Sequence, residues 1–178
     1  DAADNPTLVN YDLAGRRTVI DSPDAGRSTT EYDAAGNVIR RTTAALRARG
    51  QSSITYRYEE SQLVSVDHPG SEADVRLTWG GATAPAGQRG RVVETRDAGG
   101  ILEREYGLLG EVTRETRHLY RHNQTAPRLA QMDDPSFRPQ GPRPTTRYRH
   151  DTWGRMLEMV YPDGEVLTYA YDAGGLVS

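Results

Sequence analysis

The chain has no cysteine and no lysine, and its 178 residues include only one phenylalanine and two tryptophans. The absence of cysteine excludes disulfides, thiolate catalysis and cysteine-ligated zinc. All 22 basic residues are arginines, a bias that we attribute to a GC-rich genome. The formal net charge of −3 does not favour a general binder of polyanions such as nucleic acid. No apolar run approaches the roughly 20 residues of a membrane-spanning helix, and no signal peptide is visible.

Turn-forming residues are abundant instead. The chain has 18 glycines and 10 prolines, and only 35% of its residues are hydrophobic. Helix breakers at this density favour short elements joined by tight turns. The low hydrophobic content suits a sheet that has one face in water. Neither end resembles a natural terminus, so we expect the parent protein to be longer.

A tyrosine-aspartate motif, Tyr-Asp-x-x-Gly, repeats along the chain, with degenerate copies between the full ones. The residues that open successive copies are Tyr11, Tyr32, Tyr58, Trp79, Tyr106, His150 and Tyr171. The interval is 21 residues from Tyr11 to Tyr32, and again from Tyr58 to Trp79 and from His150 to Tyr171. Longer intervals hold inserts near 44–52, 81–88 and 121–144. Self-similarity at a fixed period predicts a repeat architecture over residues 1–178.

Each repeat is predicted to be a β-hairpin. The clearest copy has a strand at 156–161, a turn at 162–164 and a return strand at 165–171. Similar turns, built from Pro, Asp and Gly, are expected at 23–26, 69–70 and 97–100. The return strands alternate with period two, which indicates half-buried strands; Ile54, Tyr56 and Tyr58 share one face, as do Val75, Leu77 and Trp79, and Leu167, Tyr169 and Tyr171. A helical turn is allowed only at 42–49 and 111–121.

The motif residues are predicted to have structural roles. The aspartates accept backbone N–H groups at the first position of a type I turn, and the glycines take the left-handed conformation that ends it. The tyrosine ends a strand and is expected to pack its ring under the next hairpin. The candidate motif residues are Tyr11, Asp12, Gly15, Arg16, Tyr32, Asp33, Gly36, Tyr58, Trp79, Tyr106, Gly110, Asp151, Gly154, Arg155, Tyr171, Asp172 and Gly175.

Catalytic and metal-binding alternatives are weaker. Calcium-binding β-rolls have a nine-residue period, whereas carboxylates 21 residues apart come from different hairpins. His118 and His122 have the i, i+4 spacing of a helical metal site, but no third ligand lies nearby, and we interpret them as surface or loop histidines. No Ser/His/Asp arrangement is present, and the adjacent pair Asp133 and Asp134 would point to opposite faces of a strand. We therefore predict no enzyme activity, cofactor or metal.

The segment 121–149 is rich in arginine and proline. It is interpreted as a mobile surface loop, with contact to an acidic surface or a glycan as the alternative. Nucleic-acid binding is not favoured, because the only aromatic residues among these arginines are Phe137 and Tyr148.

The spaced Tyr-Asp-x-x-Gly-Arg units resemble the RHS/YD-repeat family, which includes bacterial Rhs toxins, the shell components of Tc toxins, and teneurins. The resemblance implies an all-β array of antiparallel hairpins that add side by side into a curved, spiralling sheet, which in complete bacterial members encloses a toxin domain. Family shells end in an Asp-Pro-x-Gly element that releases the toxin. Here 134–137 reads Asp-Pro-Ser-Phe and lacks the glycine, so no protease is expected.

The resulting prediction is a non-catalytic shell segment of a secreted or cell-surface bacterial protein. Its partners would be neighbouring repeats and an enclosed toxin domain. The alternative is a cell-surface module that binds carbohydrate or a receptor. Strands at Thr7–Tyr11 and Leu167–Tyr171 would form open edges, so edge-to-edge self-association is also expected.

Overall fold

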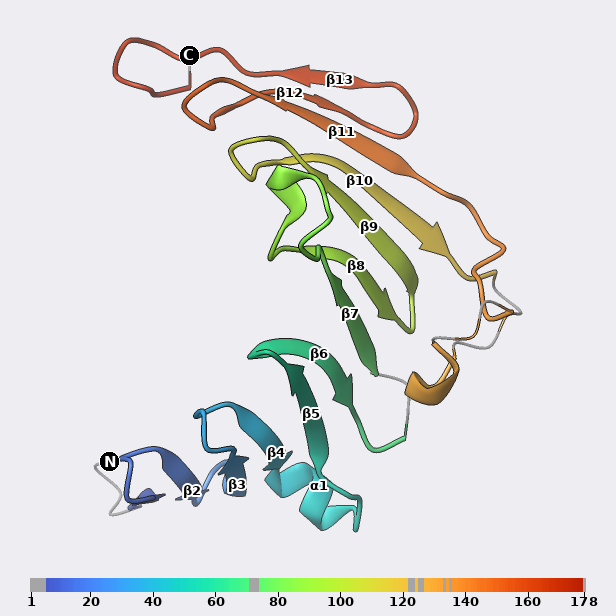
Figure 1. Ribbon diagram of the computed structural model, residues 1–178. Coiled ribbons are helices and arrows are strands. Elements are labelled where there is room, and N and C mark those ends of the chain that lie inside the picture. Colours follow the sequence, from blue (N-terminus) through green and yellow to red (C-terminus); the bar gives the residue numbers. More distant parts are fainter. Residues whose placement is uncertain are drawn as a thin grey trace. The chain divides into compact units, whose positions relative to one another are not determined.

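A computed structural model describes residues 6–70, 74–121, 124, 127–132, 134 and 136–177. Its contacts divide the chain into two compact units, Asp1–Asp74 and Val75–Ser178. In both units the strands are antiparallel and follow one another in chain order, so the predicted all-β hairpin class is confirmed (Figure 1). No helix in the described part of the chain is long and apolar enough to cross a membrane.

The first unit contains six strands and one short helix. They are β1 (Leu8–Tyr11), β2 (Arg17–Ser22), β3 (Gly26–Tyr32), β4 (Val38–Thr42), α1 (Ala44–Ala48), β5 (Ile54–Glu59) and β6 (Gln62–Asp67). The predicted turn at 23–26 joins β2 to β3. The predicted alternation on β5 is confirmed, since Ile54, Tyr56 and Tyr58 are half-buried while the residues between them are exposed.

The α1 helix lies in the first predicted insert, where a helical turn was allowed. Thr43 caps it, because its hydroxyl accepts the backbone N–H of Leu46 at 3.3 Å. Gly50 follows with a φ of 62°, which ends the helix after little more than one turn. The insert is therefore a compact one-turn cap beside β3.

The second unit contains seven strands and two 3₁₀ turns. They are β7 (Val75–Trp79), η1 (Ala86–Gln88), β8 (Val92–Asp97), β9 (Gly100–Tyr106), β10 (Val112–Leu119), η2 (Leu129–Gln131), β11 (Thr145–His150), β12 (Met156–Val160) and β13 (Val166–Thr168). The predicted turns at 97–100 and 162–164 join β8 to β9 and β12 to β13.

Two sequence predictions for this unit are wrong. The segment 111–121 holds no helical turn; it holds β10, which pairs with β9 on one side and β11 on the other, and these ladders override the weak local helical pattern. The last return strand is short and fully exposed, with Leu167 at 40% exposure, because β12 is its only strand neighbour among the described residues. The β1 and β13 edges are thus open in the described structure, and self-association through them stays a prediction.

The hydrophobic core is small, as expected for a sheet that is mostly one layer thick. Among the described residues only Val64, Ile101 and Met132 are buried hydrophobic side chains. Ile101 lies between Arg96 and His118 on neighbouring strands, so these three share one face of the second unit. The insert at 121–144 reaches this face, because the Arg96 guanidinium donates to the Met132 carbonyl oxygen.

The interpretation of 121–149 as a mobile surface loop is partly wrong, because 145–149 belong to β11 and described residues of the insert at 121–144 are buried. Pro127, Met132 and Pro139 are buried. Its C-terminal end is also bonded to β10, because the Leu119 N–H donates to the Pro142 carbonyl at 3.0 Å and the Gly141 N–H donates to the Leu119 carbonyl at 2.9 Å. The described residues of the insert therefore contact the sheet at Arg96 and at Leu119.

Candidate functional site

The motif turns share one backbone geometry. In the first, the Asp12 N–H donates to the Arg16 carbonyl at 3.0 Å, and the Gly15 N–H donates to the Asp12 carbonyl at 3.0 Å. The same two bonds recur in the turns that begin at Asp33, Gly107, Asp151 and Asp172. The glycines that close these five turns all have φ between 76° and 91°, where an L side chain would be strained.

A β-bulge accompanies the turns. The pairing register shifts immediately before Tyr11, Tyr32, Tyr58, Trp79 and His150. A left-handed glycine at the end of a type I turn commonly produces such a bulge. The 21-residue repeat thus contains two strands and two turns. The turn at 162–164 has the same pair of backbone bonds as the motif turns, because the Tyr161 N–H donates to the Glu165 carbonyl at 2.8 Å and the Gly164 N–H donates to the Tyr161 carbonyl at 3.0 Å.

The motif aspartates use both carboxylate oxygens. Asp12 Oδ1 accepts the backbone N–H groups of Ala14 and Arg16 at 2.9 Å, and Oδ2 accepts Nε of Arg16 at 2.7 Å. The Arg16 backbone bond, then the Arg16 side chain, hold the pKa of Asp12 below its usual value. Asp33 has a lowered pKa chiefly because the Asn37 side chain donates to it at 2.9 Å.

Asp151 shows the same arrangement in the second unit. Partial burial alone would raise its pKa, but the Arg155 side chain at 2.7 Å, with the Arg155 and Trp153 amides, lowers the pKa overall. Each aspartate thus organises its own turn as a charged acceptor, and its oxygens are already occupied by these donors.

The motif tyrosines connect neighbouring repeats. The Tyr32 hydroxyl donates to the Arg17 carbonyl at 2.9 Å. Tyr106 donates to Val92 in the same way at 2.7 Å, and Tyr171 donates to the Met156 carbonyl at 2.7 Å. Each acceptor begins the strand that follows the preceding motif. The expectation that the ring packs under the next hairpin is therefore wrong, because the hydroxyl bonds to the first strand of the hairpin that the tyrosine itself ends.

The motif arginines complete the link from the other side. The Arg16 guanidinium lies 4.8 Å from the centre of the Tyr32 ring and donates to the Asp33 carbonyl at 3.0 Å. Arg155 lies 4.7 Å from the centre of the Tyr171 ring. Such cation–π contacts contribute about 0.5–1 kcal/mol at exposed sites. We call the recurring Tyr, Asp, Gly and Arg positions the motif ladder.

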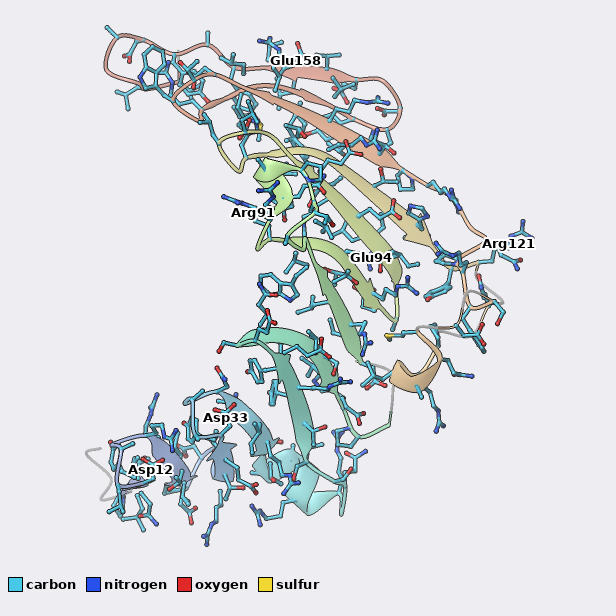
Figure 2. All side chains as sticks on the ribbon, viewed as in Figure 1. Asp12, Asp33, Arg91, Glu94, Arg121 and Glu158 are labelled. Atoms are coloured by element: carbon cyan, nitrogen blue, oxygen red, sulfur yellow. The ribbon has the colours of Figure 1, made fainter. Side chains whose placement is uncertain are left out.

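One ladder arginine was missed in the sequence. The Gly80 N–H donates to the Arg91 carbonyl and the Gly90 N–H donates to the Gly80 carbonyl, both at 2.9 Å, which are the two bonds of a motif turn. The segment 81–89 is inserted between them. Arg91 lies 5.9 Å from the Tyr106 ring centre and is the ladder arginine of this repeat; Figure 2 shows it beside the η1 loop. The dipeptide Gly90-Arg91, which matches Gly15-Arg16, was the available signal.

The Tyr106 copy exchanges the position of its carboxylate. Gly107 stands at the position of Asp12 and Asp151, and Glu111 stands at the position of Arg16 and Arg155. A Cβ on Gly107 would overlap the Glu111 carboxylate, so the glutamate occupies the space that the aspartate would need. Glu111 Oε2 is buried without a hydrogen-bond partner among the described residues. The turn is preserved although its acid comes from the opposite end of the motif.

The Tyr58 copy is a different turn. Glu60 and Ser61 have φ of 48° and 65°, which is typical of a two-residue hairpin connection of the primed kind. This explains why the copy is shortened and lacks the glycine.

His118 is not a surface histidine, which corrects the sequence interpretation. It lies on β10 at 8% exposure, with its Nε2 2.9 Å from Oε2 of Glu103. It lies on the face of the sheet that the insert at 121–144 reaches through the bond from Arg96 to the Met132 carbonyl. His122 lies outside the described residues. Within the described ranges, no three His, Cys, Asp or Glu side chains converge as a metal site would require.

The Asp-Pro segment at 134–137 forms a local turn. Asp134 Oδ1 accepts the Ser136 N–H at 2.8 Å, and this bond lowers the pKa of Asp134. Pro135 lies outside the described residues. The Asp134 carboxylate therefore accepts a backbone hydrogen bond within the insert.

These observations define an array of antiparallel hairpins joined by a ladder of motif turns. Three-dimensional comparison finds the same architecture in Tc toxin components. The crystal structure of TcdB2-TccC3 matches with a TM-score of 0.80 and 26% identity, over 96% of this chain and 9% of that chain. TcdB2-TccC3 without its hypervariable C-terminal region matches with a TM-score of 0.80 and 26% identity, over 97% of this chain and 8% of that chain.

The Photorhabdus luminescens Tc holotoxin pore, with a mutation in TccC3, matches with a TM-score of 0.74 and 27% identity, over 96% of this chain and 8% of that chain. The chain therefore spans less than a tenth of the length of these neighbours. It matches no family model and no curated protein sequence. The neighbours are RHS/YD-repeat shell proteins, so the resemblance that the motif predicted is confirmed.

Proposed function

We propose that this chain is a non-catalytic segment of a bacterial RHS/YD-repeat shell, in a secreted or cell-surface protein, and that it helps to enclose a toxin domain. The observation that carries the proposal is the motif ladder. In three described repeats the tyrosine that ends a hairpin bonds through its hydroxyl to the first strand of that hairpin, and the arginine of the preceding motif turn lies over the tyrosine ring. These contacts join one repeat to the next, which is the requirement of a wall.

The neighbours support this role. They are Tc toxin components in which RHS/YD repeats form a shell, and the match covers almost all of this chain. Asp12 pairs with Arg16, Asp151 pairs with Arg155, and Asp33 accepts from Asn37, so the carboxylates of these three turns are engaged by donors of their own turns. Saturated polar groups are what a structural repeat needs.

The test compares limited proteolysis of the parent protein with and without residues 6–177. We expect the domain that follows the repeats to resist digestion only when the segment is present. A matched control deletes only 81–87, which leaves Gln88 and Arg89 as a two-residue tip between Gly80 and Gly90, the length of the other motif turns, and should preserve protection. Equal digestion of the following domain in all three proteins would contradict the enclosing role.

A further inference from the structure

The first unit has a groove of about 390 Å³ on one face of its sheet, within the range of ~300–1,000 Å³ typical of small-molecule sites. We call it the tyrosine groove and define it by Tyr32, Tyr56, Tyr58, Arg17 and Arg41. Tyr56 and Tyr58 are on the same side of β5 because side chains alternate along a strand. Three aromatic rings and two guanidiniums thus meet in one hollow.

The charge of the tyrosine groove is not balanced. No aspartate or glutamate lines it, and within the described residues neither Arg17 nor Arg41 forms an ion pair. The arginines on the opposite face differ: Arg40 pairs with Glu31 at 3.2 Å, and Arg57 pairs with Glu59 at 2.7 Å. The neighbouring residues Arg40 and Arg41 therefore differ: Arg40 is paired with a carboxylate, whereas Arg41 forms no ion pair within the described residues.

The nearest acid does not neutralise the groove. Asp33 lies close enough to Tyr58 to help raise the pKa of its phenol, behind the larger effect of burial and that of Tyr56. The Asp33 carboxylate is itself tied to the Asn37 side chain and amide. Tyr58 consequently remains a neutral hydroxyl donor, and the two arginines remain available to an anion.

We propose that the tyrosine groove binds a saccharide that carries a carboxylate, such as a hexuronic acid unit. A pyranose has an apolar C–H face that stacks on a tyrosine ring, and its hydroxyls match the phenol and threonine hydroxyls of the groove. Its carboxylate suits the guanidiniums of Arg17 and Arg41, which can bind it with paired hydrogen bonds. The proposal is independent of the wall role, since the ladder contacts do not require a ligand.

An acidic peptide fits less well. Peptides that bind to sheets gain affinity from main-chain hydrogen bonds at a free strand edge. The tyrosine groove lies over β2 to β6, whose backbone groups are already paired in ladders, and side chains form its floor. A peptide there would leave its N–H and C=O groups without main-chain partners, whereas a sugar has no backbone to satisfy.

The test is titration calorimetry of the full 178-residue chain with trigalacturonate at low ionic strength, with neutral maltotriose as the comparison sugar. We expect heat from trigalacturonate only, with binding that weakens as salt is added. Arg41→Gln and Tyr56→Ala should each reduce affinity at least tenfold. Arg40→Gln is the matched control on the opposite face and should bind like the wild type, and circular dichroism checks that every variant is folded.

Three outcomes would overturn the proposal. The first is the absence of trigalacturonate binding, and the second is equal binding of maltotriose, which would remove the role of the carboxylate. The third is tight binding of an acidic peptide such as a Glu-Leu repeat with similar sensitivity to Arg41→Gln, which would identify a peptide site in place of a sugar site. Each result leaves the proteolysis test of the shell role unaffected.

Discussion

The glycine at the end of a motif turn provides the sharpest stability test of the ladder. Gly154 has a φ of +78°, and a Cβ built on it meets no heavy atom within 4 Å. Replacing it by alanine therefore adds no clash, and the cost comes from holding an L residue in the left-handed region, roughly 1–2 kcal/mol. For a chain of this length, each kcal/mol lowers Tm by about 2–4 °C, so we expect Gly154→Ala to lower Tm by about 2–8 °C.

The control is another open glycine with ordinary backbone geometry. A Cβ on Gly81 also meets nothing within 4 Å, but its φ is not in the left-handed region. Gly81→Ala should therefore change stability by less than about 0.5 kcal/mol. Gly154→Asn should lie between the two, because asparagine tolerates the left-handed region better than alanine does. Thermal and urea unfolding measure all three. If Gly154→Ala is as stable as the wild type, or if Gly81→Ala costs as much, the turn does not depend on its left-handed residue.

Three further results are expected. Tyr106→Phe should cost about 0.5–1.5 kcal/mol in urea unfolding through loss of its hydrogen bond to the Val92 carbonyl of β8. Tyr11→Phe should be neutral, because its ring is exposed and its hydroxyl has no such bond among the described residues; equal effects would contradict the inter-repeat role of the hydroxyl. Met132→Ala should lower the free energy of unfolding by about 2–5 kcal/mol and speed proteolysis of the insert, because the side chain is buried. Leu108→Ala, at 90% exposure, should do neither. If Met132→Ala is as stable and as resistant to protease as the wild type, the insert does not pack on the sheet. The pKa of Asp151 lies below its unfolded value of 3.8, so the contribution of its carboxylate to folding stability is present above that pH and is lost as the pH falls through the folded pKa. The free energy of unfolding should therefore decline more steeply on acidification in the wild type than in Asp151→Asn. Parallel pH profiles of the two proteins would refute the assignment.

The repeat turns were predictable from the sequence because their chemistry is local. An aspartate that accepts amides two and four residues ahead, and a glycine that ends the turn, need only the motif itself. Hairpin pairing followed from alternation and turn spacing. The position of Gly90-Arg91 was hidden by an insert that separates the two halves of a motif.

The remaining errors concern long-range packing. His118 is buried on the sheet face to which an insert that follows it in sequence returns, and the alternation of residues along β10 does not predict that return. The direction in which the motif tyrosine packs depends on which strand pairs with its own strand and in which register, and the local sequence does not determine either. Local propensity allowed a helical turn at 111–121, but β10 forms there because it pairs with a strand on each side, β9 and β11.

The interrupted turn between Gly80 and Gly90 has a consequence for protein engineering. The same pair of backbone hydrogen bonds closes a two-residue tip after Asp12 and the much longer tip at 81–89. Loop-closure entropy rises by only about 0.6 kcal/mol for each doubling of loop length, so the base of the turn tolerates a change in what it carries. A foreign epitope inserted between Trp153 and Gly154 should thus be displayed at the tip of that motif turn without disturbing strand pairing. The motif turns are therefore suitable positions for inserted sequences.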